Sequence, residues 1–252
     1  MMLTQPFTLQ EARNLYSDKT LGYSIFASDS MFRLFAPRAF RVSLVLFDNY
    51  TDTQGVEFPM VRDEQGVWEY SMTKPTQHYY GYRVCGPEEK PEHFNGSIII
   101  ADPYSQAVVT QNTYSHRAKS IILDTHFDWS DDTFSPPADH RELIIYECHI
   151  RDMTMHPSAE IQAKGTYTGF VEYGKKGGLS SIKELGINAV ELLPIHEFAN
   201  IEPPYNDASV KEHLGLVNTW NPYSRNHWGY MTSFFFAPES YYASDGSIVA
   251  GE

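Results

Sequence analysis

Apolar and polar residues alternate in short segments through the first half of the chain. Residues 31–37 and 41–47 alternate well enough to be strands, and residues 67–72 and 79–84 continue the pattern. Glycine, proline and other turn-forming residues separate these segments. Many short strands at this spacing, without a long helical period, predict an antiparallel β-sandwich.

The pattern changes beyond residues 130–141, a polar and proline-bearing stretch that we interpret as a linker. Residues 143–146 form a near-continuous apolar run, which is typical of a strand buried on both faces of a parallel sheet. A helix is predicted over residues 179–185, because its apolar residues share one face and Gly186 follows as a C-cap. The next strand is predicted over residues 187–193.

A strand, a helix and a strand at this spacing form a βαβ unit. The sequence therefore predicts two domains, a β-sandwich in residues 1–135 and a β/α domain in residues 136–252. In β/α barrels the segments after the strands face the substrate. Residues 194–230 follow the second strand and are long for a loop in a compact domain, so we interpret them as a substrate-facing loop.

The composition is that of an ordinary folded protein, with 42% hydrophobic and 20% charged residues in 252. The formal net charge of −13 argues against nucleic acid and against an anionic membrane surface as partners, because both require a basic face. A neutral sugar polymer makes no such demand. The 17 tyrosines and 15 phenylalanines would suit stacking on sugars, but a β-rich core explains most of them.

Cys85 and Cys148 lie in apolar, strand-like runs, so we predict buried, reduced thiols rather than a disulfide or a metal clip. The ten histidines and two cysteines form no zinc pattern such as Cys-x-x-Cys, and no phosphate loop or Gly-x-Ser-x-Gly motif occurs. The sequence shows neither a secretory signal nor a run approaching the ~18 apolar residues of a membrane span. We therefore expect a cytoplasmic protein that requires no cofactor.

Three segments of the second half carry a family resemblance. They are Leu-Ile-Ile-Tyr-Glu-Cys-His-Ile-Arg-Asp-Met-Thr at residues 143–154, Leu-Gly-Ile-Asn-Ala-Val-Glu-Leu-Leu-Pro-Ile-His-Glu-Phe at residues 185–198, and Asn-His-Trp-Gly-Tyr-Met-Thr at residues 226–232. Their order and spacing resemble the first two β/α units of the α-amylase superfamily (glycoside hydrolase family 13), closest to isoamylase-type glycogen debranching enzymes.

The first half is similar to the immunoglobulin-like early-set sandwich that precedes the barrel in those enzymes and is often classed as a glycogen-binding module. This part of the resemblance rests on residues 32–37, 42–46, 79–87 and 98–104. Trp68 bears on whether such a sandwich binds sugar, since it is equally a candidate for the core and for a ligand platform.

The resemblance implies that the second half is the start of a (β/α)8 TIM barrel that is incomplete in this chain. A full barrel takes roughly 250 residues. In the family, the catalytic carboxylates lie on later strands, and none of the motifs that carry them occurs after Glu239 in this sequence. We therefore expect the N-terminal part of a glycoside hydrolase that cleaves α-1,6-glucosidic branch linkages of glycogen-like α-glucans when complete. The chain alone is expected to be inactive, with an α-glucan and the missing remainder of the barrel as partners.

In the resembled family, the tyrosine of a Trp-Gly-Tyr motif forms the stacking platform under the sugar ring at the cleavage subsite. Tyr230 is at that position, with Trp228 beside it and His196 just after the second predicted strand, so these three are the expected substrate-binding residues. The alternative is that Trp228 and Tyr230 only pack the barrel rim. His227 departs from the commoner Asn-Tyr-Trp-Gly-Tyr form of the family.

The resemblance also implies a structural calcium ion, which isoamylase-type enzymes bind near the second strand. Glu197, Asn200 and Glu239 fall on the ligand positions. Carboxylate and amide oxygens are the hard donors that calcium prefers.

Glu147, His149 and Arg151 alternate along the first predicted strand of the β/α domain and would therefore share one face. Three ionisable groups in a buried strand need mutual pairing. We interpret them as a structural polar network rather than as part of an active site.

Other functions fit the same residues. A glycogen branching enzyme or a trehalose-releasing hydrolase would keep the fold and change the reaction, although branching enzymes usually carry Phe-Gly-Tyr in place of Trp-Gly-Tyr. A non-catalytic α-glucan-binding module would bind glucan without turnover.

Overall fold

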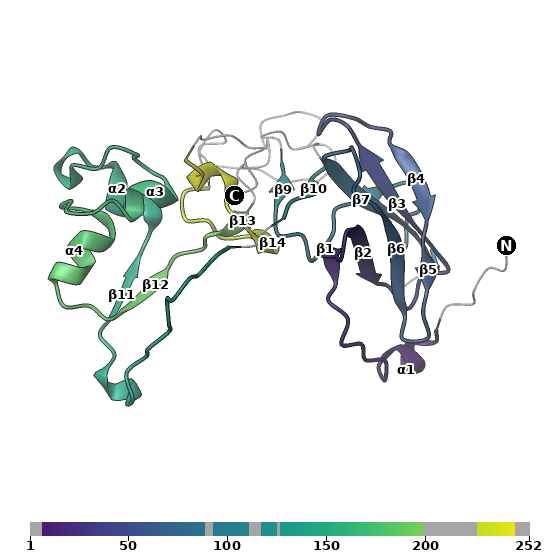
Figure 1. Ribbon diagram of the computed structural model, residues 1–252, viewed down its shortest axis with the longest axis horizontal. Helices are drawn as coiled ribbons and strands as arrows, with labels where there is room; N and C mark the ends of the chain where they lie inside the picture. Colours follow the sequence, from purple (N-terminus) through teal and green to yellow (C-terminus); the bar gives the residue numbers. More distant parts are fainter. Residues whose placement is uncertain (1–6, 89–92, 111–116, 125–126, 199–225, 245–252) are drawn as a thin grey trace, which may run out of the picture. The chain divides into compact units, whose positions relative to one another are not determined.

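The computed structural model describes residues 7–88, 93–110, 117–124, 127–198 and 226–244. These residues form two compact units (Figure 1): the first holds the described residues up to 124, and the second holds those from 127 onward. The predicted domain boundary after residue 135 stays a prediction.

The first unit is a β-sandwich of two antiparallel sheets. One sheet has the strand order β1-β2-β6-β5, and the other has the order β4-β3-β7-β10-β9 with β8 also paired to β7. The short helix α1 (Leu9–Ala12) precedes them, with Thr8 as its N-cap. The strands are β1 (Gly22–Phe26), β2 (Asp29–Phe35), β3 (Arg41–Phe47), β4 (Val56–Pro59), β5 (Val61–Arg62), β6 (Val67–Thr73), β7 (Tyr79–Cys85), β8 (Ile99–Ile100), β9 (Val108–Val109) and β10 (Lys119–Ile121).

The predicted alternation builds the core of the sandwich. Phe32 and Leu34 point inward from β2, and Leu44 meets them from β3 in the other sheet. Trp68 is only 4% exposed, and its indole N–H donates to the Ala36 carbonyl at 2.9 Å. Trp68 is therefore a core residue, and the four strands predicted in this half are confirmed as β2, β3, β6 and β7.

A buried carboxyl group lies inside the sandwich. Asp102 is fully buried, and the hydroxyls of Tyr80 and Tyr82 donate to its Oδ2 at 2.9 and 3.1 Å. Its backbone N–H donates to the Ser120 hydroxyl at 2.8 Å. Burial raises the pKa of Asp102, although its hydrogen bonds act in the opposite direction. The group joins the segment after β8 to strands β7 and β10.

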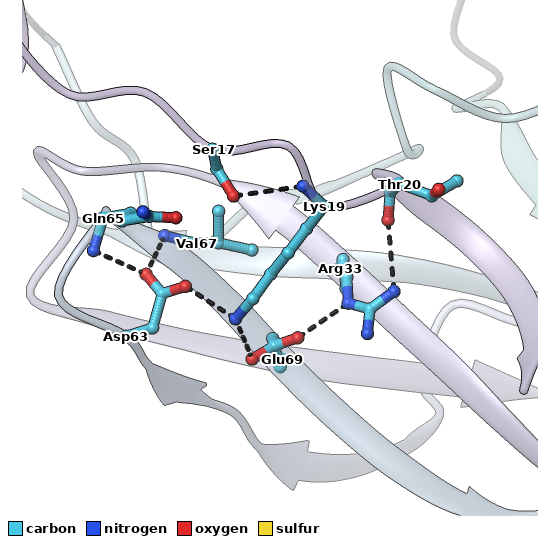
Figure 2. A network of polar contacts seen from close by, with 8 residues as sticks. All are labelled: Ser17, Lys19, Thr20, Arg33, Asp63, Gln65, Val67 and Glu69. Carbon is cyan, nitrogen blue, oxygen red and sulfur yellow. Dashed lines mark hydrogen bonds and ion pairs between the residues drawn. The ribbon is translucent and has the colours of Figure 1, made fainter.

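A network of charged side chains spans strands β2 and β6 and the segment before β1 (Figure 2). Lys19 Nζ lies 2.8 Å from Asp63 Oδ2 and 2.7 Å from Glu69 Oε2. Arg33, which pairs directly with Glu69 across the two strands, donates from Nε to Glu69 Oε1 at 2.6 Å. Glu69 therefore receives two cations, and the network ties the chain before β1 to the sheet.

The second unit contains the predicted βαβ unit. Strands β11 (Ile145–Cys148) and β12 (Ala189–Leu192) are parallel, with Tyr146 opposite Val190. Figure 1 shows the connecting helices grouped beside this strand pair. Gly186 has φ +76 just after the last helix, in the left-handed conformation expected of a helix stop. The helical segments are η1 (His140–Glu142), α2 (Ile150–Met155), η2 (Pro157–Ala159), α3 (Tyr167–Phe170), α4 (Gly178–Glu184) and η3 (Ser240–Tyr242).

The prediction that the first strand of this unit is buried on both faces is wrong. Tyr146 and Cys148 pack against the helices, whereas Ile145 is 58% exposed and Val190 on β12 is 37% exposed. Only these two strands form their sheet in the part of the chain that is described, so their second face has no covering layer. The near-continuous apolar run is therefore half exposed.

The predicted alternation of Glu147, His149 and Arg151 along one strand is also wrong. The strand β11 ends at Cys148, His149 is the N-cap of α2, and Arg151 lies within that helix. The helix starts here because His149 Nδ1 accepts from the backbone N–H groups of Arg151 and Asp152, at 3.1 and 3.4 Å. The three side chains do not share a strand face.

Two further strands complete the second unit. Strand β13 (His196–Phe198) pairs antiparallel with β14 (Thr232–Pro238), with register shifts on both sides of Glu197. Cys85 and Cys148 are buried free thiols, as predicted. None of the helices among the described residues has the length and apolar character needed to cross a membrane.

Candidate functional site

The Trp228–Gly229–Tyr230 segment is held in place by the backbone of its central glycine. Gly229 has φ +75, and a Cβ built on it would lie 2.7 Å from the Pro194 carbonyl oxygen and 3.1 Å from the Phe198 ring. Only glycine fits both the left-handed conformation and this close approach. The two flanking rings are directed outward, with Trp228 55% and Tyr230 57% exposed.

His149 anchors the same segment from the other side. Its Nδ1 accepts from two backbone amides, so its proton is on Nε2, which donates to the His227 carbonyl oxygen at 2.7 Å. The Tyr242 hydroxyl lies 3.0 Å from the same Nε2. His149 is 2% exposed, and this burial lowers its pKa, so the neutral ring is favoured.

These contacts place the aromatic segment at the carboxyl ends of both parallel strands. His149 directly follows β11, and Pro194 comes two residues after β12. In parallel β/α sheets the carboxyl ends of the strands are where ligands bind. The ends of β11 and β12 therefore lie next to the segment that carries the exposed rings of Trp228 and Tyr230.

Tyr230 and Trp228 differ in their surroundings. Trp228 makes edge-on contacts with the rings of His149 and His227, with centroids 6.4 and 5.4 Å apart. Tyr230 is held by a hydrogen bond to its backbone: Asn226 Nδ2 donates to the Tyr230 carbonyl oxygen at 2.5 Å. Trp228 and Tyr230 are each more than half exposed. Their roles in binding remain predictions.

His196 is exposed on β13, and its ring centroid lies 6.5 Å from that of Phe235 on β14. It belongs to the same short segment, residues 194–198, against which Gly229 packs. His196 therefore follows the second parallel strand, as predicted from the sequence. Its role in binding stays a prediction.

Glu197 and Glu239 are both fully buried and are brought together by β13 and β14. Glu197 Oε2 accepts from the Ser240 N–H at 3.0 Å, and Glu239 Oε2 accepts from the Phe198 N–H at 3.1 Å. Each carboxylate thus bonds to the residue that follows the other acid in the chain. Asn200, the third predicted calcium ligand, lies outside the described residues.

The partly buried Tyr167 and the buried Tyr242 border these acids. Burial, reinforced by the negative charge of Glu239, raises the pKa of both Tyr167 and Tyr242. Both phenols therefore stay protonated, and the Tyr167 hydroxyl donates to the Ile195 carbonyl oxygen at 3.0 Å. The Ser240 hydroxyl is buried without a hydrogen-bond partner among the described residues. Two carboxylates and a hydroxyl form a set of hard oxygen donors that fits calcium.

Sequence reasoning missed the roles of His149 and Tyr242 at this site. The two residues are 93 positions apart, and no spacing motif links them. The alternation of polar residues predicts a strand face for His149, and nothing in the sequence singles out Tyr242. His227 was visible as a departure from the family form, and that was the one hint of altered surroundings for the aromatic segment.

The two-sheet sandwich of the first unit and the parallel strand pair of the second unit can now be compared with known proteins. Residues 20–105 match the family described as carbohydrate-binding module 48 (isoamylase N-terminal domain), and this part of the chain belongs to it. The chain as a whole is a relative of the isoamylase and glycogen-debranching enzymes, so the resemblance carried by its motifs is confirmed.

Curated relatives include the chloroplastic isoamylase SU1 of Zea mays, 32% identical over 89% of this chain and 27% of that protein. A glycogen debranching enzyme of Salmonella paratyphi B is 30% identical over 88% of this chain and 34% of its own length. Among solved structures, a pullulanase from Paenibacillus barengoltzii in complex with maltohexaose and alpha-cyclodextrin has a TM-score of 0.71 and 28% identity, over 97% of this chain and 36% of that one. The chain thus spans about a third or less of the proteins it matches.

Proposed function

We propose that this chain is the glucan-binding N-terminal part of a glycoside hydrolase that hydrolyses α-1,6-glucosidic branch linkages of glycogen-like α-glucans. The observation that carries the proposal is the position of the Trp228–Gly229–Tyr230 segment over the ends of two parallel strands. The names of the relatives (isoamylase, glycogen debranching enzyme and pullulanase) support α-1,6 specificity over the branching and trehalose-releasing alternatives.

Tyr230 is the stacking platform in this proposal. The faces of its ring and of Trp228 offer apolar area to the C–H side of a glucose unit, and exposed His196 is positioned to hydrogen-bond a sugar hydroxyl. Both rings are already exposed, so binding requires no unpacking. The maltohexaose complex of the similar pullulanase supports an α-1,4-linked glucan chain as the ligand.

The strand pair β11–β12 begins a TIM barrel in this proposal. Its parallel pairing and the helices between the strands support a β/α barrel. The exposed side chains of Ile145 and Val190 support the remainder of the barrel as the partner that covers them. The catalytic carboxylates would come from that remainder. The buried free thiols support a cytoplasmic location.

A calcium ion would be held by Glu197 and Glu239, with the Ser240 hydroxyl nearby and Asn200 as a further ligand. The support is the burial of both carboxylates in one place and the Ser240 hydroxyl, which has no hydrogen-bond partner among the residues that the structure describes. Bound there, calcium would neutralise the two acids and join β13 to the segment after β14. Its role would be structural.

Affinity electrophoresis in gels that contain glycogen, pullulan or a soluble β-glucan tests the proposed function. We expect glycogen and pullulan to retard the chain and the β-glucan to have no effect, with no reducing ends released from pullulan by the chain alone. Equal retardation by the β-glucan would contradict α-glucan recognition. Turnover by this chain would contradict the assignment of the catalytic groups to the missing part.

A non-catalytic α-glucan-binding module is the second candidate, because the family match to a carbohydrate-binding module covers residues 20–105. The two candidates differ in where glucan binds. Retardation that depends on Tyr230 favours the debranching enzyme, whereas retardation that is unchanged in Tyr230→Ala favours binding by the sandwich.

A further inference from the structure

We propose that His149, Asp152 and His227 form a binding site for a divalent transition-metal ion of the zinc type, separate from the oxygen-donor site at Glu197 and Glu239. One ligand atom from each of the three side chains lies within 4.8 Å of the others. The proposal does not depend on the glucan-binding function.

The geometry is close to what such an ion needs. Tetrahedral zinc with bonds of about 2.0–2.2 Å places its ligand atoms roughly 3.4 Å apart. His227 Nε2 and Asp152 Oδ1 are already 3.0 Å apart. Their side chains are 47% and 52% exposed, so they have room to rotate by the small amount that brings them around an ion. His149 is the buried, fixed member of the set.

The tautomer of His149 suits a ligand. Its Nε2 donates to the His227 carbonyl oxygen at 2.7 Å, which leaves Nδ1 as the nitrogen with the lone pair. Metal-binding histidines characteristically donate their other N–H to a carbonyl or carboxylate in this way. One ring nitrogen of His149 and one carboxylate oxygen of Asp152 lie within 4.8 Å of each other. An ion at Nδ1 would take over the lone pair that accepts from the Arg151 and Asp152 N–H groups at 3.1 and 3.4 Å, so binding would displace these two cap contacts.

The donor set selects the class of ion. Two imidazoles and one carboxylate suit zinc, nickel or copper, whereas calcium and magnesium prefer oxygen ligands only. The stacked arrangement of His149 and His227, with ring centroids 4.6 Å apart, keeps the two imidazoles together before any ion binds. An open fourth position would take water, because Asp152 and His227 face solvent.

The site would cross-link two distant parts of the second unit. His149 and Asp152 belong to the start of α2, and His227 belongs to the segment that carries the exposed aromatic rings. No spacing motif predicted it, because the histidines are 78 positions apart and meet only after folding. The family form noted above has tyrosine in place of His227, so the site would be a property of this chain.

Calorimetric titration of Zn²⁺ into the chelator-treated chain tests the proposal. We expect one ion per chain, with affinity lowered about tenfold or more in His227→Tyr and in Asp152→Asn, because each removes one of three protein ligands. His227→Tyr introduces the residue common in the family, so it should preserve the fold. His140→Tyr, which alters an exposed histidine outside the cluster, should bind Zn²⁺ as the unaltered chain does.

The melting temperature provides a second measurement. Zn²⁺ should raise it in the unaltered chain and in His140→Tyr, but not in His227→Tyr, because an ion that binds only the folded state stabilises it. Zinc binding that is absent, unchanged in both His227→Tyr and Asp152→Asn, or displaced by an equal concentration of Ca²⁺ would overturn the proposal.

Discussion

At the scale of single residues, Gly229 fixes the direction of the aromatic rings. Replacing it with alanine should cost about 1–3 kcal/mol of folding free energy, because the added Cβ meets the Pro194 carbonyl oxygen at 2.7 Å in a left-handed conformation. Denaturant unfolding measures this cost. Gly174→Ala is the matched control, since Gly174 also has a positive φ but has nothing within 4 Å of an added Cβ. Equal costs for the two variants would show that the close approach is unimportant.

Glu69 makes the stability of the sandwich depend on pH. Burial acts to raise the pKa of Glu69, but its hydrogen bonds to Lys19 and Arg33 outweigh this and lower it, and the pKa of Asp63 is lowered likewise through Lys19. A lowered folded-state pKa stabilises above the unfolded value of about 4.3, and that stabilisation is lost as pH falls through the folded value.

Glu69→Gln should therefore destabilise the chain at pH 7 by about 1–2 kcal/mol, and the difference should disappear in strong acid. Urea unfolding at both pH values tests this. Asp139→Asn, which changes the exposed pair between Asp139 and Arg141, is the control and should have no measurable effect. A constant difference between pH 7 and strong acid would mean that Glu69 acts through packing rather than charge.

Glu239 tests the calcium proposal. Calcium should raise the melting temperature of the chain, and Glu239→Gln should abolish the increase, because the variant removes one of the two buried carboxylate ligands. Glu184→Gln, at an exposed acid on α4, should respond to calcium as the unaltered chain does. A calcium response that persists in Glu239→Gln would place the ion elsewhere.

At the scale of elements, alternation was a sufficient guide wherever one face of a strand is buried. Strand β3 begins and ends at the predicted residues, and β2, β6 and β7 deviate by at most a few. The spacing of apolar residues also predicts β11, α4 and β12, because the apolar spacing of the helix differs from that of the two strands. It failed for α2, since Glu147, His149 and Arg151 continue the polar alternation of a strand. The helix starts there because of a side-chain cap.

Strands β13 and β14 were not predicted. Strand β13 has three residues, too few for a period, and its partner begins more than 30 positions later. Pairing over such a separation depends on tertiary contacts rather than on local sequence. Trp228, Tyr230 and His196, which were predicted from the family resemblance, are exposed in the structure. Glu197 and Glu239 lie close together, each bonded to a backbone N–H beside the other. The contacts around His149 depend on residues far apart in the sequence, so no local pattern predicts them.

The open face of the β11–β12 pair should cause self-association. Ile145→Lys should lower the concentration-dependent light scattering of the chain, because it introduces a charge on an exposed apolar strand. Leu9→Lys is the control, since Leu9 is 53% exposed but lies on the helix α1. Equal scattering from the unaltered chain and Ile145→Lys would mean that this face does not associate.

At the scale of the whole molecule, the chain combines a sandwich that matches carbohydrate-binding module 48 with a second unit that contains a parallel strand pair. The two units contribute differently to the account: the sandwich buries its tryptophan Trp68, whereas the second unit exposes Trp228 and Tyr230. We therefore assign the proposed glucan recognition to the second unit.

The dissociation constant for maltohexaose, measured by calorimetry for the chain and for Tyr230→Ala, tests this assignment most directly. We predict measurable binding by the chain and about tenfold weaker binding by the variant, since a stacked aromatic ring contributes about 0.5–1.5 kcal/mol beyond its buried area. Tyr173→Ala, at a tyrosine that is 97% exposed in the same unit, should bind as the unaltered chain does. Identical affinity of the chain and Tyr230→Ala would contradict the account.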